Sequence, residues 1–157
     1  MSNHQNRTTQ SGVILLGMLV FVLLATLAGS SLIASSQLRS QRMKEIELLF
    51  AGDQFRRAIL SYYNTVPPGG SRQLPPTLEA LLEDKRFPMP IRHLRRLYPD
   101  PMTGRSDWDV IVVNGGIAGV KSTSRGAPVK RAGFPQMYES FSQAGAYSEW
   151  QFSLPSQ

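Results

Sequence analysis

The sequence contains no cysteine, and this absence excludes several kinds of chemistry. Disulfide bonds, thiolate zinc sites and a cysteine nucleophile all require it. Histidine is scarce as well, with only His4 and His93, so a histidine-rich zinc site is excluded too. No serine lies in a Gly-x-Ser-x-Gly elbow, and Gly115, Gly116 and Gly119 lack the strand-then-helix context of a phosphate loop. We therefore expect a protein that is not an enzyme and that holds no cofactor and no metal.

Charge is absent from one long stretch, residues 13–34, in which only Thr26, Ser30 and Ser31 are polar. As a helix this stretch would be about 33 Å long, which is enough to cross a hydrocarbon layer of about 30 Å. The alternative is a buried core helix, but the rest of the chain has too little apolar sequence to surround a helix that is hydrophobic on every side. The stretch is therefore predicted to be a membrane anchor.

The chain as a whole is basic, with 17 Lys and Arg against 11 Asp and Glu and a net charge of +6. Such a balance favours anionic partners, such as nucleic acid or an acidic lipid surface. The cations are scattered between Arg7 and Arg131, however, so the total charge alone points to no particular ligand.

A polar leader, residues 1–11, precedes the anchor and ends at Gly12. An ordinary signal peptide has its small cleavage-site residues after the apolar stretch, where this chain has Ala28 and Gly29, so that alternative stays open. A glycine between a short polar leader and an apolar helix resembles instead the type IV prepilin and pseudopilin signal. The resemblance implies that a prepilin peptidase cuts between Gly12 and Val13 on the cytoplasmic face and methylates the new amino terminus.

The chain differs from the usual family pattern at two positions. The family usually has phenylalanine or methionine after the cut, where this chain has Val13, and a glutamate at the fifth mature position, where it has Gly17. In the family, that glutamate pairs with the amino terminus of a neighbouring subunit, so its absence bears on how this chain would enter a filament. Helices in lipid associate through small residues, which predicts close approach between subunits along this segment. The expected positions are Gly17, Ala25, Ala28 and Gly29.

The orientation of the anchor has two interpretations. Arg7 and the amino terminus lie before it, and three cations follow it: Arg39, Arg42 and Lys44. By the positive-inside tendency, the bulk of the chain would then be cytoplasmic. The family resemblance implies the opposite, a single-pass protein of the bacterial inner membrane with a periplasmic carboxyl-terminal domain. We follow the resemblance.

The residues after the anchor are helix formers without a proline until Pro67, so one helix can run over residues 13–63. In its second half, residues 35–66, apolar residues recur at spacings of three and four. This pattern predicts a face packed on the chain's own globular domain, and the alternative is packing against neighbouring subunits. These residues are Leu48, Ala51, Phe55, Ile59 and Tyr62. Charge is expected around the remaining circumference, at Arg42, Glu45, Asp53, Arg56 and Arg57. Gly52 is a point at which the helix could bend.

The remaining residues, 67–157, are enough for one small domain. Thr77 can cap a short helix over residues 78–84, and Pro90 can open another over residues 91–97.

A basic strip, Arg92, Arg95 and Arg96, would lie on the second of these short helices. Such a strip is either a solvated face with local carboxylate partners or a contact with anionic lipid, DNA or an acidic subunit surface. A contact with DNA would make the chain a minor pilin-like receptor.

Strand patterns occupy the rest of the domain. Two of them, residues 108–113 and 117–122, flank the Asn-Gly-Gly of residues 114–116, and Asn-Gly between two β-rich runs predicts a hairpin. Apolar and polar residues alternate again over residues 150–154, which predicts a third strand. Residues 123–148 are predicted to be a long loop. The expected fold is α+β, with a small antiparallel sheet laid against the lower half of the long helix.

Several segments of this domain and of the helix before it resemble type II secretion pseudopilins, in a branch related to the major pseudopilin. The segments are ELLFAGDQFRRAILSYY (residues 47–63), LPPTLEALLEDKR (74–86), RHLRRLYPDPMTG (92–104), the hairpin that begins at Trp108, and YSEWQF (147–152). The family implies a pilin-like, lollipop-shaped subunit whose helices bundle into a short periplasmic filament that helps to export folded proteins. The implied partners are other pseudopilins, the inner-membrane secretion platform and the prepilin peptidase.

The major pseudopilin of this family also binds calcium in a loop near its carboxyl terminus. Calcium takes about six to eight oxygen ligands, usually with several carboxylates among them. The corresponding stretch here has only Glu139 and Glu149, so we do not expect the site. Asp107 and Asp109 would share one face of a strand, and we expect them to face solvent rather than to hold a metal.

The predicted organisation has four parts: a prepilin-type leader (residues 1–12), a transmembrane helix half (13–34), its amphipathic continuation (35–66) and a small periplasmic head (67–157). The expected function is that of a non-enzymatic, pseudopilin-like subunit of a type II secretion or related type IV filament machine. The alternatives are a minor pilin-like receptor for DNA or surfaces and a simple signal-anchored periplasmic protein.

Overall fold

A computed structural model describes residues 7–155, without the side chains of residues 7–11 and 25–35. Residues 1–6 of the predicted leader lie outside this range. The chain divides into two compact units, Met1–Ser40 and Gln41–Gln157. In the first unit the described residues all belong to helix α1 (Arg7–Asn64), which contains the whole of the predicted helix and begins earlier.

The apolar part of α1 is described only in part. Residues 12–24 are exposed, whereas the side chains of residues 25–34 of the predicted anchor lie outside the described set. A search of the described residues found no helix both long enough and apolar enough to cross a membrane.

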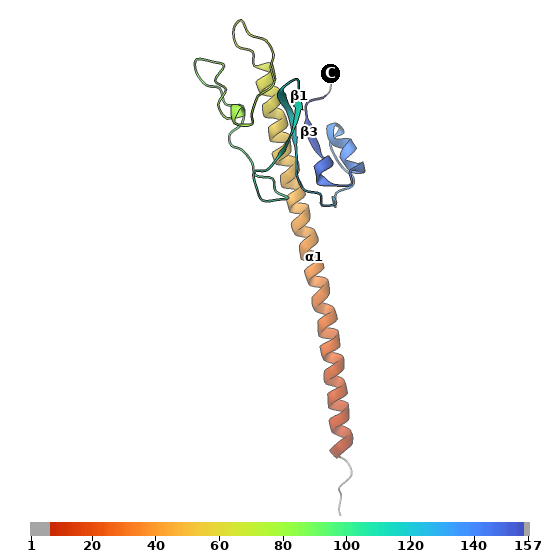
Figure 1. The fold of residues 1–157 in the computed structure, drawn as a ribbon. Coiled ribbons are helices and arrows are strands. Elements are labelled where there is room, and N and C mark those ends of the chain that lie inside the picture. Colours follow the sequence, from red (N-terminus) through yellow and green to blue (C-terminus); the bar gives the residue numbers. More distant parts are fainter. Residues whose placement is uncertain (1–6, 156–157) are drawn as a thin grey trace, which may run out of the picture. The chain divides into compact units, whose positions relative to one another are not determined.

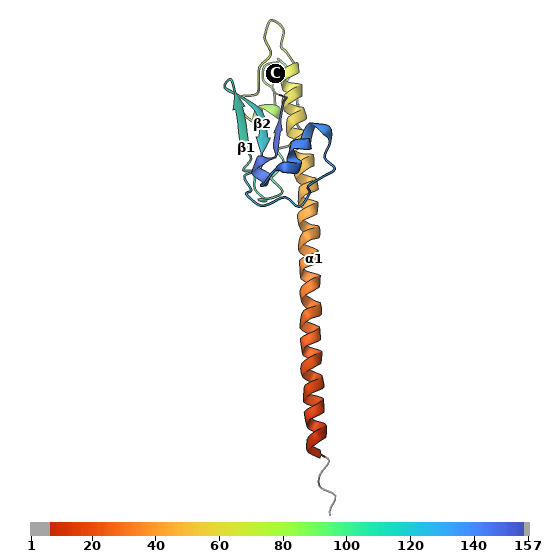
Figure 2. The same cartoon turned by 90° about the vertical axis from the view of Figure 1, so that its right-hand side faces the viewer.

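The second unit is α+β, as predicted (Figures 1 and 2). It contains the C-terminal part of α1 and, among the described residues, six shorter elements. These are the 3-10 helices η1 (Glu79–Leu81), η2 (Gln136–Gln143) and η3 (Tyr147–Glu149) and the strands β1 (Asp109–Val113), β2 (Gly116–Lys121) and β3 (Gln151–Ser153).

The three strands form an antiparallel sheet in the order β1-β2-β3. The predicted hairpin is confirmed, and its turn explains the Asn-Gly signal. Asn114 and Gly115 have φ angles of 50° and 78°, and a tight hairpin turn with two left-handed residues strongly favours this pair. Val113 then pairs with Gly116, and a bulge interrupts the register between Ile111 and Val112.

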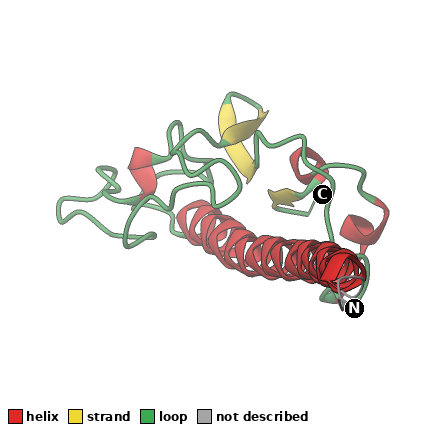
Figure 3. Cartoon of the chain, turned by 90° about the horizontal axis from the view of Figure 1, so that it is seen from below, coloured by secondary structure: helices red, strands yellow, loops and turns green. Residues whose placement is uncertain are grey.

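The apolar face predicted on the second half of α1 is buried. Its five residues are each at most 4% exposed: Leu48, Ala51, Phe55, Ile59 and Tyr62. They belong to one core with Val120 of β2, Phe152 of β3 and Trp150, which are fully buried. In Figure 3 the strands lie together on one side of the part of α1 that belongs to this unit.

Gly52 has a different role from the predicted bend. A Cβ built there would overlap the ring of Phe152, so only glycine lets β3 come this close to the helix. The helix continues through Gly52 to Asn64.

Two predicted short helices are corrected. Over residues 78–84 only the single turn η1 forms, although Thr77 does accept the predicted capping bond from Ala80 N, at 3.3 Å. Over residues 91–97 no helix forms, because the backbone N–H groups of His93 and Leu94 both donate to Leu81 O, at 2.9 and 2.8 Å. The backbone of this segment pairs with η1 and Asp84 rather than with itself.

The predicted loop over residues 123–148 is also corrected. It contains η2 and the start of η3, and it contributes the buried rings of Tyr138, Phe141 and Tyr147 to the core. Phe141 stacks on Trp150 with centroids 5.2 Å apart, so the segment supplies a large part of the aromatic packing.

Candidate functional site

The residues predicted for processing are accessible where the structure describes them. Gly12 and Val13 both lie within α1, and Val13 is 70% exposed. Gly17 has nothing within 4 Å of the position a Cβ would take. The other predicted assembly residues have side-chain positions outside the described set: Ala25, Ala28 and Gly29.

The Tyr-Pro-Asp-Pro-Met-Thr-Gly sequence at the end of the predicted segment 92–104 is a turn built around Asp100. This side chain is fully buried, and its Oδ1 accepts a bond from Met102 N at 2.9 Å. Its Oδ2 accepts a bond from the Ser122 hydroxyl at 2.6 Å, and Gly104 N donates to Asp100 O at 2.7 Å. The motif therefore fastens the turn to the end of β2, and its role in this fold is structural.

The predicted basic strip is exposed but is not helical. Arg92, Arg95 and Arg96 are all exposed, and within residues 7–155 none of them forms an ion pair. Arg96 lies over the ring of Tyr98, 5.0 Å from its centre, and Tyr98 meets the exposed ring of Phe50 edge-on at 5.8 Å. Arg96 is thus linked through Tyr98 to the surface of α1.

A buried ionic cluster caps the C-terminal end of α1. Asp84 has a fully buried side chain, and it accepts bonds from Arg86 Nε to Oδ1 at 2.9 Å and from Nη2 to Oδ2 at 2.7 Å. The same Nη2 donates to the carbonyl oxygens of Tyr62 and Thr65, at 2.9 and 3.0 Å. These carbonyls lie at the helix end, where the dipole is negative and where a cation is favourable.

His93 extends this cluster to Ser61. Its Nε2 lies 3.2 Å from Asp84 Oδ2 and its Nδ1 lies 2.8 Å from Ser61 Oγ. The side chains of Ser61, His93 and Asp84 therefore form a hydrogen-bonded line. The spacing of these residues along the chain does not reveal it.

The surroundings of this line are poorly suited to nucleophilic catalysis. Asp84 already forms a bidentate pair with Arg86, and the His93 side chain is only 1% exposed. Ser61 lies near the carbonyl end of α1, where the helix dipole opposes the negative oxygen that acyl transfer develops. The arrangement is suited to holding the helix end in place.

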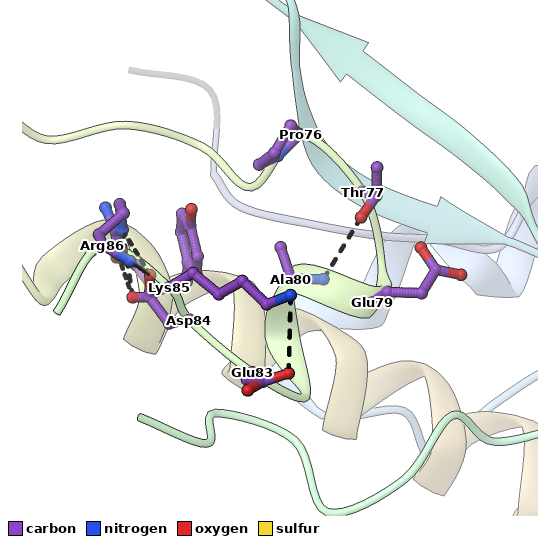
Figure 4. Close-up of a pocket in the computed structure, with 9 residues that line it drawn as sticks. Pro76, Thr77, Glu79, Ala80, Glu83, Asp84, Lys85 and Arg86 are labelled. Carbon is purple, nitrogen blue, oxygen red and sulfur yellow. Dashed lines mark hydrogen bonds and ion pairs between the residues drawn. The ribbon is translucent and has the colours of Figure 1, made fainter. Parts of the chain in front are cut away.

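A pocket of about 500 Å³ adjoins the cluster (Figure 4). Its described lining includes Asp84 and Arg86 but neither Ser61 nor His93, so the hydroxyl does not open into it. At its surface Lys85 lies 3.9 Å from Glu83, and both side chains are more than half exposed.

A second buried carboxylate ties the head to the start of the second unit. Glu45 is 2% exposed, and its carboxylate accepts bonds from Val129 N at 2.6 Å, Lys130 N at 3.1 Å and Tyr147 Oη at 2.9 Å. Burial raises the pKa of Tyr147 to about 12, with a further contribution from Glu45. Gln41 supports the same loop by donating to Ala127 O at 3.1 Å. The prediction that Glu45 adds charge to the exposed circumference is wrong.

A third tie lies between these two. Asp53 accepts a bond from Tyr138 Oη at 2.7 Å and pairs with Arg56 and Arg57, at 2.9 and 2.6 Å. Burial by itself would raise the pKa of Asp53, but the bonds from Tyr138 and Arg56 outweigh it, so the pKa is lowered. Burial and the bond to Asp53 raise the pKa of Tyr138 to about 12.

The aspartates near β1 pair with neighbouring cations. Asp107 lies 2.9 Å from Arg105 and accepts a bond from Thr103, and Asp109 lies 3.2 Å from Lys121. Among the described residues no group of three or more side chains could hold a metal ion.

Sequence reasoning missed the three buried carboxylates of Glu45, Asp84 and Asp100. Two weak signals exist: Glu45 lies one turn before Leu48 on the buried stripe, and Asp100 stands between two prolines in a turn sequence.

Scans of protein-family models, curated proteins and solved structures found no match to this chain.

Proposed function

We propose that this chain is a non-enzymatic, pseudopilin-like subunit of a type II secretion or related type IV filament machine. In this proposal the protein has a pilin-like fold, is anchored in the bacterial inner membrane by residues 13–34, and has its head in the periplasm. It assembles through its N-terminal helix with other pseudopilins and the secretion platform. A prepilin peptidase removes the leader after Gly12 and methylates Val13.

One observation carries this proposal. A single helix, α1, joins an uncharged apolar segment that follows Gly12 to an amphipathic segment whose apolar face is buried by the chain's own small α+β head. An apolar segment followed by a helix that carries a folded domain is suited to a subunit that is anchored and assembled through its helix and exposes its head.

The ties between the head and α1 suggest how such a subunit would work mechanically. Glu45 holds the loop at Val129 and Lys130, and Arg86 holds the carbonyls of Tyr62 and Thr65. Because these ties lie near both ends of the helical part of the second unit, a displacement of that part would move the head with it.

Mass spectrometry of the mature amino terminus tests the processing step. We expect a chain that begins with a methylated Val13 when the full-length protein is expressed in cells that contain a prepilin peptidase. Gly12→Leu, which places a bulky residue at the cut, should keep the leader. An intact Met1 in the unmodified chain would leave only a signal anchor, and a new terminus near Ser30 would indicate a secreted protein.

A deletion strain tests the assembly role independently. We expect loss of protein secretion, of pilus formation or of DNA uptake, restored by the intact gene but not by the Gly12→Leu variant. Normal levels of all three would contradict the proposal.

A further inference from the structure

One face of α1 in the second unit is not covered by the head. Met43, Ile46 and Phe50 are 60, 59 and 56% exposed. They follow one another at spacings of three and four, so they form one apolar row of about two helical turns. We call these three residues the outer row. The buried stripe of α1, which begins at Leu48, lies on the other side of the same helix.

An arginine lies at each end of the outer row. Arg42 is exposed and is one turn before Ile46, and Arg96 lies over Tyr98, whose ring meets Phe50. Within the described part of the chain, neither arginine has a carboxylate partner. The surface therefore combines an apolar centre with an unneutralised cation at each end.

We propose that the outer row, with Arg42 and Arg96, is a docking surface for an amphipathic helix of a different protein. Two helices pack well when each presents apolar residues at spacings of three and four, because the rows interdigitate. The two cations select a partner helix with acidic residues at both ends of its apolar row.

The charges also disfavour the other occupants. A second copy would present the same two arginines, and like charges across an interface oppose association. Nucleic acid is bound by successive cations along its backbone, whereas here two cations are separated by three apolar side chains. Glu47 is exposed in the same stretch, but it is one carboxylate against the two cations Arg42 and Arg96, so the surface stays basic. The proposal rests on the proposed assembly through α1 and deepens it, because it specifies the chemistry of the partner helix.

Designed peptides test the surface directly on the full-length chain in neutral detergent micelles. The probe is a fluorescent helix of about three heptads with leucine in the apolar row and glutamate at the flanking positions. A second peptide has the same leucines and lysine in place of glutamate. Fluorescence anisotropy measures both affinities, with empty micelles as the blank.

We expect the glutamate peptide to bind at least about tenfold more tightly than the lysine peptide, and the difference to shrink as salt rises. Phe50→Ala should weaken both peptides. The double variant Arg42→Glu with Arg96→Glu should reverse the preference, so that the lysine peptide binds more tightly.

A matched control makes the same change of net charge near the C-terminal end of α1, away from the outer row. Arg72→Glu with Lys85→Glu alters two exposed cations near Tyr63 and the pocket, and it should leave the preference unchanged. Fluorescence of Trp108 and Trp150 verifies that each variant is folded. If the charge reversal unfolds the head, the Phe50→Ala variant and the salt titration still decide the question.

Several results would overturn the proposal. Equal affinity for both peptides would remove the charge selection, and an equal effect of the control double variant would show that only net charge matters. Self-association of the chain that Phe50→Ala abolishes would assign the surface to a second copy. Tighter binding of single-stranded DNA or of anionic vesicles, lost in Arg42→Glu with Arg96→Glu, would assign it to those partners. None of these results depends on leader processing or secretion, so the two proposals fail separately.

Discussion

Asp84 and Arg86 form a bidentate ion pair that closes the C-terminal end of α1. Arg86 Nε and Nη2 donate to Asp84 Oδ1 and Oδ2 at 2.9 and 2.7 Å, and the guanidinium carbon lies 3.6 Å from the centre of the Tyr62 ring. The same guanidinium donates to two helix carbonyls. Arg86 thus bonds to the Asp84 carboxylate, packs on the ring of Tyr62 and donates to the carbonyls at the helix end. Because it joins three parts of the unit, disrupting its ion pair should destabilise the whole head.

Replacing Asp84 by asparagine should destabilise the head by about 3 kcal/mol, because it leaves the largely buried Arg86 without its counter-charge. Urea unfolding of the full-length chain in neutral detergent, followed by the fluorescence of Trp108 and Trp150, measures this. The matched control is Glu83→Gln, which removes the partner of Lys85 in an exposed pair at 3.9 Å and should change stability by less than about 1 kcal/mol. Equal effects of the two substitutions would contradict the structural role of the pair.

The contribution of Asp84 should depend on pH. Burial by itself would raise the pKa of Asp84, but bonds from the Arg86 side chain and backbone and from His93 outweigh it and lower the pKa from 3.8 to about 2. The folded state therefore binds this proton less tightly than the unfolded state does. The resulting stabilisation, about 2 kcal/mol, is present above the unfolded pKa and is lost as the pH falls through about 2.

Unfolding free energies of the unmodified chain and of Asp84→Asn, compared from about pH 6 to about pH 2, test this dependence. The difference in unfolding free energy between the unmodified chain and Asp84→Asn should narrow by about 2 kcal/mol on acidification. A gap that stays constant, or one that widens at low pH, would show that the carboxylate is not the titrating group.

The parts of the fold that follow from local patterns could be predicted. The buried stripe of α1 is visible because apolar residues recur at helical spacing, and the hairpin is visible because Asn114 and Gly115 accept the left-handed conformations that its turn requires. Both signals depend only on neighbours along the chain.

The parts that depend on distant partners could not be predicted. Residues 91–97 have helical spacing of apolar side chains, and Leu94 is indeed buried, but the backbone of His93 and Leu94 bonds to Leu81 instead. The carboxylate of Glu45 is satisfied by backbone groups at Val129 and Lys130, which no local pattern connects to it. The proximity of Arg96 to the outer row could not be predicted either, because Arg96 and Phe50 meet only through Tyr98.

Replacing Glu45 by glutamine should loosen the loop that it holds. The substitution removes a buried charge that accepts bonds from Val129 N, Lys130 N and Tyr147 Oη, and such bonds to a charged group are worth about 2 kcal/mol together with the cost of unsatisfied donors. Hydrogen exchange should become faster at the amides of Val129 and Lys130 before the rest of the head is affected.

Glu47 provides the matched control for Glu45, since it lies on the same helix two residues later and is exposed. Glu47→Gln should leave the exchange of both amides unchanged and alter stability by less than about 0.5 kcal/mol. If the two variants exchange alike, the loop is held by its apolar contacts and the carboxylate is dispensable.

Replacing Gly52 by alanine should destabilise the head although alanine is the better helix former. Helix propensity alone would favour alanine by about 1 kcal/mol, but its Cβ would overlap the ring of Phe152, and overpacking of this kind costs about 1–3 kcal/mol. A smaller side chain opposite should relieve the overlap, so Phe152→Leu is the informative second change. In urea unfolding, we expect Gly52→Ala to be less destabilising in the Phe152→Leu background than in the unmodified chain. Equal losses in both backgrounds would mean that the backbone shifts to accommodate the methyl group and that the close approach of β3 does not require glycine.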